Sequence, residues 1–555
     1  MALAHTTSRR ARPPRRPEPS RWPAPTAAGS WSSTASTYNA GDLRRRLPPP
    51  PGDYRGHSDT EILLNAISVR GVERALRAAS GMWAIAAWDT ARRQLHLTRD
   101  RFGEKPLYVG WCGPDLVFSS ELPAFRAHPD FKGTIDRSAL GEYLRWGAVP
   151  APSSIFEQVR KVPPATHVVC HAPTASVATE RYWEVPRIGR RHTGAARPGS
   201  GGRDATVDTF SALYGEAVAR QLESDVPIGG FLSGGVDSTL TAAMGVRTHG
   251  TGSATFTIGV HDPSRDEAPH ARAVAKHLGT EHHERYVDDD ELVAVAHELP
   301  SVYDEPIADI SQIPTVLLSR FAREHVTVAL SGDGGDEIFA GYRHYERALA
   351  RREALRRIPR PLARGGRVAA RCVSRYAGSA IAPAALPVSG HLRDATLADQ
   401  LRTAGEFLAD EPVGTLHRFA MSVAPFPRRL VVGAPDPVHP AVQCDDTVSD
   451  PLAAMMRADL MHYLPDRLLT KVDRAAMSVA LETRHPLLDP SVIEYVWGHA
   501  DLTLDAGDPK WLPKAALARH GARRALRPTQ EGVRCASRRV DARAAAPVGR
   551  RPARP

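Results

Sequence analysis

Two short loops rich in glycine, serine and acidic residues carry the clearest chemical signal in the sequence. The first, SGGVDS, runs from Ser233 to Ser238, and the second, SGDGGDE, runs from Ser331 to Glu337. Glycines let backbone N–H groups approach an anion closely, so such loops favour phosphate binding. Asp237 would repel a bare pyrophosphate unless Mg²⁺ lay between them, because Mg²⁺ binds one or two carboxylates together with phosphate oxygens. The pattern therefore predicts a site for a Mg²⁺-nucleotide.

The second loop holds three carboxylates, Asp333, Asp336 and Glu337, within five residues, and two glycines lie among them. This density of negative charge is costly unless a cation or a reacting cationic group lies nearby. Gly, Ser and Asp are also the common turn residues, so either loop alone could be an ordinary turn. Two such loops about a hundred positions apart, each after an apolar run, favour the nucleotide site.

The elements around the loops indicate how they are positioned. VPIGGFL (Val226 to Leu232) precedes the first loop and VTVAL (Val326 to Leu330) precedes the second. From Asp204 onward the order is helix, strand, loop, helix, strand, helix, helix, strand, loop. This βαβ pattern predicts a parallel sheet flanked by helices. Both loops should then lie at the carboxyl edge of the strands, where ligands bind in such sheets.

Four ordered motifs in this region resemble the synthetase domain of the glutamine-hydrolysing asparagine synthetases, members of the ATP-pyrophosphatase superfamily. They are FLSGGVDS, TFTIGV (Thr255 to Val260), SGDGGDE and LLTKVDRAAMSVALETRHPLLD, and the similarity spans Val226 to Asp489. The resemblance implies an α/β fold, with a parallel-sheet ATP-pyrophosphatase (adenine nucleotide alpha-hydrolase-like) domain. It also implies a ligase that uses ATP, aspartate and either glutamine or ammonia, and that forms asparagine, AMP and pyrophosphate through β-aspartyl-AMP.

The same resemblance implies roles for individual residues. Asp333 matches a family carboxylate that acts at the aspartyl-AMP step, either as a base or by orienting a cation. Asp237 and Asp336 would hold Mg²⁺ through the phosphates of ATP. The residues that would bind ATP lie in the two loops and the adenosine-side strand: Leu232, Ser233, Gly234, Gly235, Asp237, Ser238, Ile258, Ser331 and Gly332.

Upstream, four segments between Gly56 and Leu122 resemble the second half of a class II (N-terminal-nucleophile) glutamine amidotransferase domain: GHSDTEILL, GMWAIAAWD, TRDRFGEKPLY and FSSEL. The resemblance implies an incomplete αββα domain. WAIAAWD and QLHLTRD are typical of adjacent short strands, and SIFEQVRKVPPATHVV is typical of an exposed hairpin. Asp59 matches the residue that binds the α-amino group of glutamine, although Ser58 or Asp59 also suits the N-cap of the following helix.

The sequence departs from the family pattern at two places that bear on activity. The amidotransferase nucleophile is a Cys at the start of the mature chain, but this chain begins Met-Ala and its first cysteine is Cys112. The family segment NGEIYN is reduced to TASTYN, so we expect the glutaminase half to be impaired. Near the other end, Thr529 stands where the family segment RPKQGFGVP has a lysine, and Lys510 or Lys514 would compensate only in part. Losing one fixed electrostatic group commonly costs roughly two to three orders of magnitude in rate.

Charge and composition limit the kinds of binding partner and the cellular compartment that we expect for this chain. The 555-residue chain has a formal net charge of +10, yet residues 1–50 carry +7 and residues 511–555 carry +10, so the remainder is acidic. Basic tails poor in apolar residues predict disorder, and the acidic body argues against nucleic-acid binding. No apolar run approaches the roughly twenty residues that span a bilayer, so we expect no membrane partner. Five scattered cysteines without a CxxC pair favour the cytoplasm over a disulfide framework or a zinc site.

These signals divide the chain into five expected segments. They are a basic disordered leader (1–50), a partial glutaminase domain (51–185), a linker rich in Gly, Arg and Pro (186–205), the synthetase domain (206–515) and a basic disordered tail (516–555). A homodimer stays open as the assembly. Asp473 and Arg474, in the fourth motif, are either residues of a substrate pocket or an ordinary surface ion pair.

Two alternatives stand beside the asparagine-synthetase-type ligase. A related amidotransferase or cyclase of secondary metabolism would act on another carboxylate. Ring-closing relatives tend to carry Tyr at the position of Asp333, so the carboxylate favours amide formation between two molecules. A non-catalytic nucleotide-binding pseudoenzyme is the second alternative, supported by the missing Cys and Lys. Release of pyrophosphate would separate this pseudoenzyme from both ligases.

Overall fold

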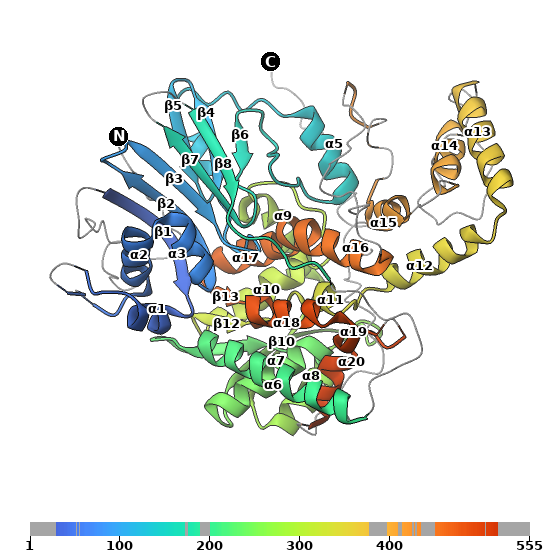
Figure 1. Ribbon diagram of the computed structural model, residues 1–555. Coiled ribbons are helices and arrows are strands. Elements are labelled where there is room, and N and C mark those ends of the chain that lie inside the picture. Colours follow the sequence, from blue (N-terminus) through green and yellow to red (C-terminus); the bar gives the residue numbers. More distant parts are fainter. Residues whose placement is uncertain are drawn as a thin grey trace, which may run out of the picture.

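The computed structural model joins an antiparallel β region, formed by the first part of the chain, to an α/β region with a parallel sheet (Figure 1). It describes residues 29–50, 53–54, 56–171, 176–188, 200–376, 397–408, 413–424, 427, 430–433, 450–505 and 507–519. Within these residues, no helix combines the length and the apolar character needed to cross a membrane.

The antiparallel region is built on a five-stranded sheet with the order β1-β2-β3-β7-β8. Its strands are β1 (Gly29–Thr37), β2 (Gly81–Asp89), β3 (Gln94–Arg99), β7 (Thr166–His171) and β8 (Ser176–Arg181). β2 and β3 pair antiparallel, which confirms the two adjacent strands predicted there.

The first part of this sheet lies in the range for which a disordered leader was expected. β1 pairs with β2 along its whole length, and helix α1 (Ala40–Arg46) follows with Leu43 buried. The segment GSWSSTAST gives little hydrophobic signal of its own. The apolar surface comes from β2, in which Met82, Trp83 and Ile85 are buried. The formation of β1 therefore depends on pairing with a strand that lies more than forty positions away in the sequence. The expectation of disorder up to residue 50 was therefore wrong for residues 29–46.

Four layers make up the amidotransferase-like region. Helices α1, α2 (Asp59–Arg70) and α3 (Val72–Ala78) cover one face of the five-stranded sheet and share a core with Trp83. The other face packs on a three-stranded sheet with the order β5-β4-β6, and helices α4 and α5 cover that sheet in turn. These elements are β4 (Tyr108–Cys112), β5 (Asp115–Ser119), β6 (Val159–Lys161), α4 (Pro123–Arg126) and α5 (Arg137–Trp146). The layering is αββα, as the resemblance implied.

The segment predicted as an exposed hairpin has a different structure. β6 pairs with β4, whereas β7 pairs with β3, so its two strands belong to different sheets. Both are largely buried, with Val159 and Val168 in the interior. The two prolines between them mark the crossing from one sheet to the other and not a hairpin turn, which local sequence cannot distinguish.

The α/β region contains a five-stranded, all-parallel sheet with the order β11-β10-β9-β12-β13, which confirms the predicted parallel sheet. Its strands are β9 (Ile228–Phe231), β10 (Ala254–Val260), β11 (Glu281–Val287), β12 (Val328–Leu330) and β13 (Glu482–Arg484). β13 was not predicted, because three residues are too few to show a strand pattern.

Helices cover both faces of the parallel sheet (Figure 1). On one side lie α6 (Ser200–Leu222), α7 (Val236–His249), α8 (Ala268–Leu278), α18 (Pro490–Gly498) and α20 (Trp511–Arg519). On the other lie α9 (Asp289–Val302), α10 (Gln312–Arg323) and α17 (Thr470–Met477). α6 begins inside the expected linker, and α20 extends into the expected tail because Ala516 and Leu517 are buried in the core.

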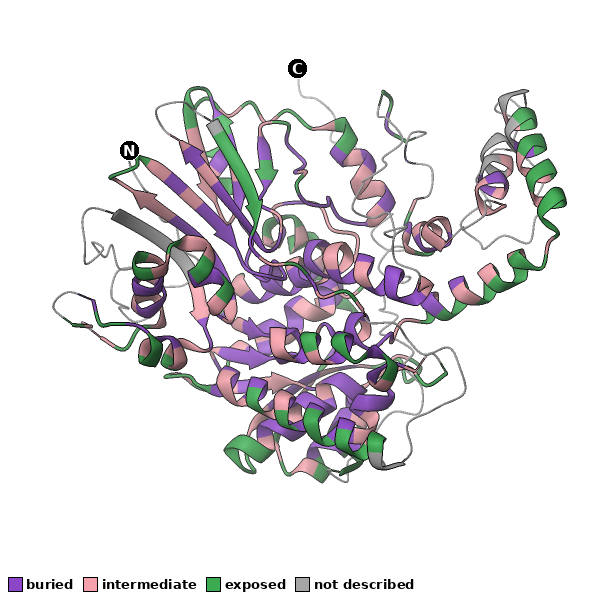
Figure 2. Cartoon of the chain, viewed as in Figure 1, coloured by how far each residue is buried: buried purple, intermediate pink, exposed green. Residues whose placement is uncertain are grey.

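The remaining helices lie between β12 and α17. They are α11 (Gly335–Ile338), α12 (Arg343–Arg356), α13 (Arg360–Tyr376), α14 (Leu397–Phe407), α15 (Val413–Met421) and α16 (Pro451–Ala458). A wide π-helical segment, η4 (Asp459–Leu469), continues α16 into α17, and the short η5 (Pro486–Leu488) and α19 (Ala500–Thr503) come later. Helices α12 to α14 extend away from the body, and α12 and α13 are more exposed than the sheets (Figure 2).

Candidate active site

The first loop connects β9 to α7 at the carboxyl edge of the parallel sheet. Gly234 has a φ of +75°, and a Cβ on it would lie 2.9 Å from the Cβ of His270, so a larger residue does not fit. The Leu232 amide donates to the Phe256 carbonyl at 3.0 Å, which ties the loop to β10, the strand that carries Ile258. Backbone N–H groups at the start of α7 are thereby available to an anion.

The second loop connects β12 to α11 and lies directly against the first. The Ser331 amide donates to the Arg484 carbonyl at 2.8 Å, which anchors the loop on β13. A Cβ on Gly332 would lie 2.7 Å from the Ser238 amide nitrogen, and a Cβ on Gly335 would overlap the Asp237 carboxylate. The glycines of the second loop thus allow the two loops to touch. The structure brings the predicted residues of both loops together.

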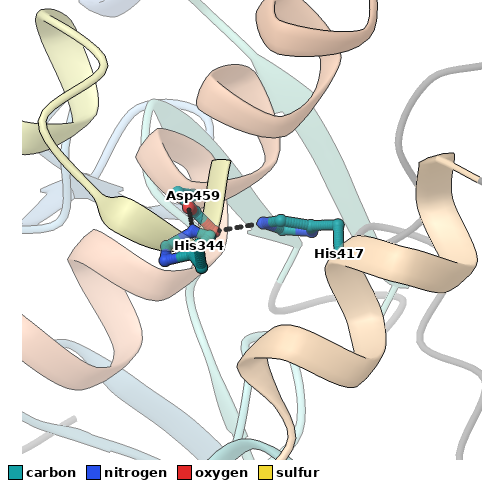
Figure 3. A group of neighbouring side chains, drawn as sticks. All are labelled: His344, His417 and Asp459. Carbon is teal, nitrogen blue, oxygen red and sulfur yellow. Dashed lines mark hydrogen bonds and ion pairs between the residues drawn. The ribbon is translucent and has the colours of Figure 1, made fainter. Parts of the chain in front are cut away.

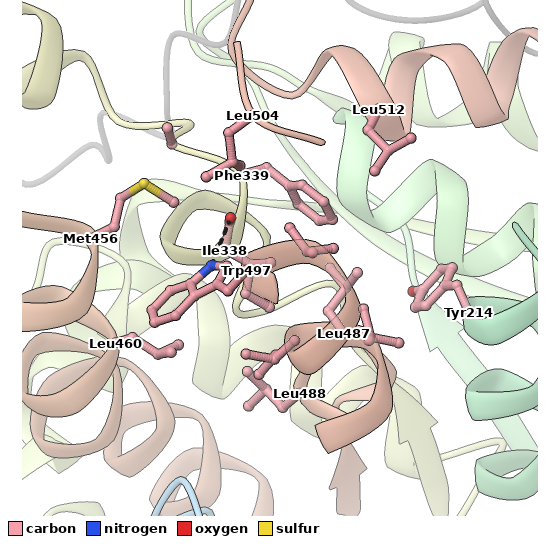
Figure 4. Packing of buried hydrophobic residues seen from close by; sticks show 14 of the residues in the cluster. Tyr214, Ile338, Phe339, Met456, Leu460, Leu487, Leu488, Trp497, Leu504 and Leu512 are labelled. Atoms are coloured by element: carbon pink, nitrogen blue, oxygen red, sulfur yellow. Dashed lines mark hydrogen bonds between the residues drawn. The ribbon is translucent and has the colours of Figure 1, made fainter. Parts of the chain in front are cut away.

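A cluster of buried hydrophobic residues packs against the second loop and the short helix that follows it (Figure 4). Gly334 has a φ of +94°, and a Cβ on it would overlap Leu488 of this cluster. Trp497 is fully buried and donates its indole N–H to the Ile338 carbonyl at 3.2 Å, at the end of α11. The loop conformation is therefore held by packing as well as by its own glycines.

Lys510 lies between the two loops. Its Nζ is 2.5 Å from Asp237 Oδ2 and 2.6 Å from Asp336 Oδ1, and the side chain is 1% exposed. Burial alone would lower the pKa of Lys510, but the two carboxylates outweigh it and raise the pKa. Burial raises the pKa of Asp237 to about 6, against the opposing charge of Lys510. A permanent cation is therefore fixed where phosphates would lie.

This geometry bears on the expectation that a catalytic cation is missing. Thr529, which was matched to the family lysine, lies outside the described residues. Lys514 pairs with Asp508 and is 38% exposed, so it does not compensate. Lys510, by contrast, lies between the two loops, because the turn before α20 brings it against Asp336. No local pattern marks this role, since Asp237 is 273 positions away in the chain.

The first loop also holds a carboxylate oxygen that could serve as a ligand for a divalent cation. Asp237 Oδ1 is buried and has no hydrogen-bond partner among the described residues. Carboxylate oxygens are the ligands that Mg²⁺ prefers, usually together with phosphate oxygens. Asp237 and Asp336 therefore fit a Mg²⁺ site, with Lys510 beside them.

Glu337, the third carboxylate of the second loop, faces away from this site. It is buried and accepts a hydrogen bond from the Tyr342 hydroxyl at 2.6 Å. Burial raises the pKa of Glu337 to about 8, with Asp336 adding to the effect. The three acidic residues therefore do not act as one cluster, because Asp336 is the one among them that contacts Lys510.

Asp333 lies at the edge where the two halves of the molecule meet. Its Oδ2 accepts a hydrogen bond from the Ser331 hydroxyl at 2.6 Å and lies 3.7 Å from Nε2 of His485. The other ring nitrogen of His485 lies 2.8 Å from Oε2 of Glu104, which belongs to the amidotransferase-like region. Neither His485 nor Glu104 was among the residues predicted for the site.

A buried set of charges crosses the same boundary. Lys105 Nζ lies 3.0 Å from Asp473 Oδ1, and Arg474 bonds both Asp473, at 2.5 Å, and Glu121, at 2.9 Å. Asp473 and Arg474 are 3% and 7% exposed. The interpretation of these two residues as a surface ion pair is wrong, because they join the two halves in the interior.

Asp59, predicted to bind glutamine, lies at the first turn of α2. Its two carboxylate oxygens accept hydrogen bonds from the Thr37 amide at 2.7 Å and the Thr60 amide at 2.8 Å. Burial raises the pKa of Asp59, partly offset by these bonds. Ser58 is the N-cap residue but makes no side-chain cap bond, so Asp59 instead fastens the end of β1 to α2.

A second group of side chains has the composition of a metal site. His344, His417 and Asp459 lie together, with the Nε2 atoms of the two histidines 3.0 and 2.9 Å from the two carboxylate oxygens (Figure 3). The Tyr345 hydroxyl donates to the same carboxylate at 2.7 Å. Three donors around one buried carboxylate satisfy it without an ion, so hydrogen bonding accounts for the arrangement.

Comparison with known proteins identifies what the chain resembles. The family model described as "Asparagine synthase" matches residues 209–535, and the model described as "Glutamine amidotransferase domain" matches residues 33–183. A protein of Mycobacterium tuberculosis strain H37Rv, named "Putative asparagine synthetase (glutamine-hydrolyzing)", is 32% identical over 488 residues, which cover 86% of this chain and 70% of that protein. The Bacillus subtilis protein "Asparagine synthetase (glutamine-hydrolyzing) 1" is 32% identical over 318 residues, 56% of this chain and 48% of that protein.

Proposed function

The chain belongs to the asparagine synthase family of ATP-dependent ligases, and we propose that it converts aspartate to asparagine through a β-aspartyl-AMP intermediate. The observation that carries this proposal is the contact between the two loops, with Lys510 bonded to one carboxylate of each. Two glycine-rich turns, a buried cation and an unpartnered carboxylate oxygen provide what a Mg²⁺-nucleotide needs.

In the first step, the β-carboxylate of aspartate attacks the α-phosphorus of ATP, and pyrophosphate leaves with the electrons of the broken P–O bond. The backbone amides at the turn into α7 bind phosphate oxygens, and Lys510 stabilises the negative charge that collects on the leaving pyrophosphate. Asp237 and Asp336 would hold Mg²⁺, which supplies further charge neutralisation when bound. The nucleotide base would contact the backbone around Leu232 and Ile258.

In the second step, ammonia attacks the acyl carbon of β-aspartyl-AMP. The C–N bond forms, the nitrogen loses a proton, and AMP leaves with the electrons of the broken C–O bond. Asp333 lies in the second loop with 27% of its side chain accessible, and in this proposal it accepts the proton. Ser331 keeps Asp333 in place through its hydroxyl.

We propose ammonia as the nitrogen donor, with hydrolysis of glutamine by this chain impaired. The carboxylate of Asp59 is already bonded to two backbone amides. In the described residues, the thiols of Cys112 and Cys170 are buried within the β sheets, and Cys372 lies on α13, so none is on the elements that surround Asp59.

The direct test is pyrophosphate release by the purified protein with ATP, Mg²⁺ and aspartate, with either ammonium or glutamine as donor. We expect asparagine and AMP in equal amounts from ammonium and a much slower reaction from glutamine. An Asp237→Asn variant should lose the release. Equal rates from both donors would contradict the choice of ammonia, and no asparagine from either donor would contradict the proposed reaction. Release that depends on a carboxylate other than aspartate would favour a related amide-forming ligase.

A further inference from the structure

His485 is a buried residue that joins the two halves of the molecule at the site of the second step. It follows β13 directly and is 3% exposed. Its Nδ1 lies 2.8 Å from Oε2 of Glu104, and its Nε2 lies 3.7 Å from Oδ2 of Asp333. Nε2 is buried and has no hydrogen-bond partner within the described part of the chain. The ring therefore points its unsatisfied nitrogen at the carboxylate that accepts the proton.

The backbone of the turn that carries Glu104 is fixed by hydrogen bonds to Asp100. The carboxylate of Asp100 accepts hydrogen bonds from the amides of Phe102, Glu104 and Lys105, at 3.1, 2.9 and 2.9 Å. Asp100 is fully buried, and Glu104 is 6% exposed. A hydrogen bond from His485 to a fixed carboxylate determines the plane of the imidazole and the direction of its second nitrogen.

The charges around His485 favour the protonated ring. Glu104 and Asp333 face the ring with negative charge, while Lys105 faces it with positive charge and is itself paired with Asp473. Burial alone would lower the pKa of His485, but the hydrogen bond and charge of Glu104, with Asp333, outweigh it and raise the pKa. A cationic ring attracts the Asp333 carboxylate and limits the orientations that it can adopt.

We propose that Glu104 and His485 are positioning residues for Asp333, so that the amidotransferase-like half contributes a carboxylate to the geometry of the amide-forming step. This inference rests on the proposed function. Nitrogen attack transfers one proton to Asp333 while the C–O bond to AMP breaks. The Glu104–His485 pair does not gain or lose that proton; it holds Asp333 where the transfer occurs. The pair should matter for amide formation more than for adenylation.

The kinetic test compares Glu104→Gln and His485→Gln with the parent, using ammonium so that no glutamine hydrolysis is needed. Glu104→Gln keeps the size of the side chain but removes its charge. We expect a loss of about 10- to 100-fold in kcat for asparagine, because a misplacement of about 1 Å can cost 10²-fold. ATP–pyrophosphate exchange supported by aspartate, which reports adenylation, should change much less. Ser80→Ala removes a 3.3 Å bond to Asp489 across the same boundary and serves as the control, with kcat unchanged.

The pH profile separates positioning from a structural role. The cationic ring is lost as the pH rises through the pKa of His485, and removing the Glu104 charge lowers that pKa. The ratio of the Glu104→Gln rate to the parent rate should therefore be lowest at pH values between the lowered pKa of His485 in the variant and its pKa in the parent. The concentration of free ammonia also changes with pH, but it changes equally for the variant and the parent and therefore cancels in the ratio of their rates. A ratio that is constant with pH, or equal losses in exchange and in asparagine formation, would overturn the proposal.

A direct titration tests the pair without relying on turnover. Histidines labelled at Cε1 are followed by NMR, and the His485 signal is assigned by its absence in His485→Gln. We expect the pKa of His485 to drop by at least about one unit in Glu104→Gln. An unchanged pKa would overturn the proposal, whether or not the parent is active. If the parent makes no asparagine but the pKa of His485 does drop in Glu104→Gln, the proposed function is wrong. The charge interaction between Glu104 and His485 is then still confirmed.

Discussion

At the scale of single residues, Lys510 decides whether the first step is possible. Its ammonium lies within 2.6 Å of carboxylates from both loops and is almost completely buried. Replacing it with Met removes the charge and keeps much of the length. We predict that Lys510→Met lowers pyrophosphate release by about 10²- to 10³-fold, which is typical of losing one fixed electrostatic group. The measurement is steady-state release with ATP, aspartate and ammonium.

Lys514→Met is the matched control, because Lys514 is four residues away and pairs with Asp508 near the surface. Its rate should stay within about twofold of the parent, since exposed ion pairs contribute about 0–1 kcal/mol. Thermal unfolding of both variants shows whether either change acts through stability. A Lys510→Met enzyme that releases pyrophosphate at the parent rate would refute the role of this lysine.

The residues of the two loops could be predicted from the sequence, but their partners could not. Ser233, Asp237 and Asp333 lie in short local patterns, and a pattern of that kind is visible without a structure. Lys510 and His485 reach the same site through contacts across 273 and 381 positions, and although His485 lies within the fourth motif, its partners are not visible in the local sequence. Their roles depend on where the chain returns in space, which periodicity and turn chemistry do not determine.

At the scale of elements, the site depends on the close approach of two loops, and that approach requires glycine. A Cβ on Gly335 would overlap the Asp237 carboxylate. We predict that Gly335→Ala separates the loops at a cost of about 1–3 kcal/mol, equivalent to about 5- to 150-fold weaker ATP binding. Calorimetric titration of the protein with ATP and Mg²⁺ measures the effect.

Gly245→Ala provides the comparison on α7, the helix that the first loop begins. Apart from the backbone of α7 itself and the neighbouring residues in the chain, no atom lies within 4 Å of a Cβ built on Gly245, so the change should leave ATP binding intact. It should also stabilise the helix by about 0.5–1 kcal/mol, because glycine is less favourable than alanine in a helix interior. Equal ATP affinity in the two variants would show that the loops need not touch.

The sequence predicted the elements whose signal is local and missed those that depend on a neighbour. β9, β10 and β12 are apolar runs followed by loop residues, so the parallel sheet followed from them. β1 is rich in Ser and Thr and gains its apolar partner from β2, while the buried end of α20 is short and follows a polar turn. Such elements become visible only when the surface they cover is known.

At the scale of the whole molecule, the two halves share a core. Phe102 and Val185, with the partly buried Trp183, come from the amidotransferase-like half but pack in the same hydrophobic cluster as the helices of the synthetase half. Each such side chain contributes about 1.5–3 kcal/mol when buried.

We predict that residues 1–188 aggregate when produced alone and become soluble when co-produced with residues 200–555. Size-exclusion chromatography and thermal unfolding of the two preparations test this. A first half that is soluble alone and unfolds cooperatively would show that the shared core is dispensable.

The central claim is that the chain activates a carboxylate as an acyl-adenylate, and isotope transfer tests it most directly. The measurement uses aspartate labelled with ¹⁸O in its β-carboxylate, together with ATP, Mg²⁺ and ammonium, and mass spectrometry of the AMP and pyrophosphate. Attack on the α-phosphorus predicts that each AMP formed carries one ¹⁸O atom and that pyrophosphate carries none. Unlabelled AMP, or label in phosphate or pyrophosphate, would contradict the account.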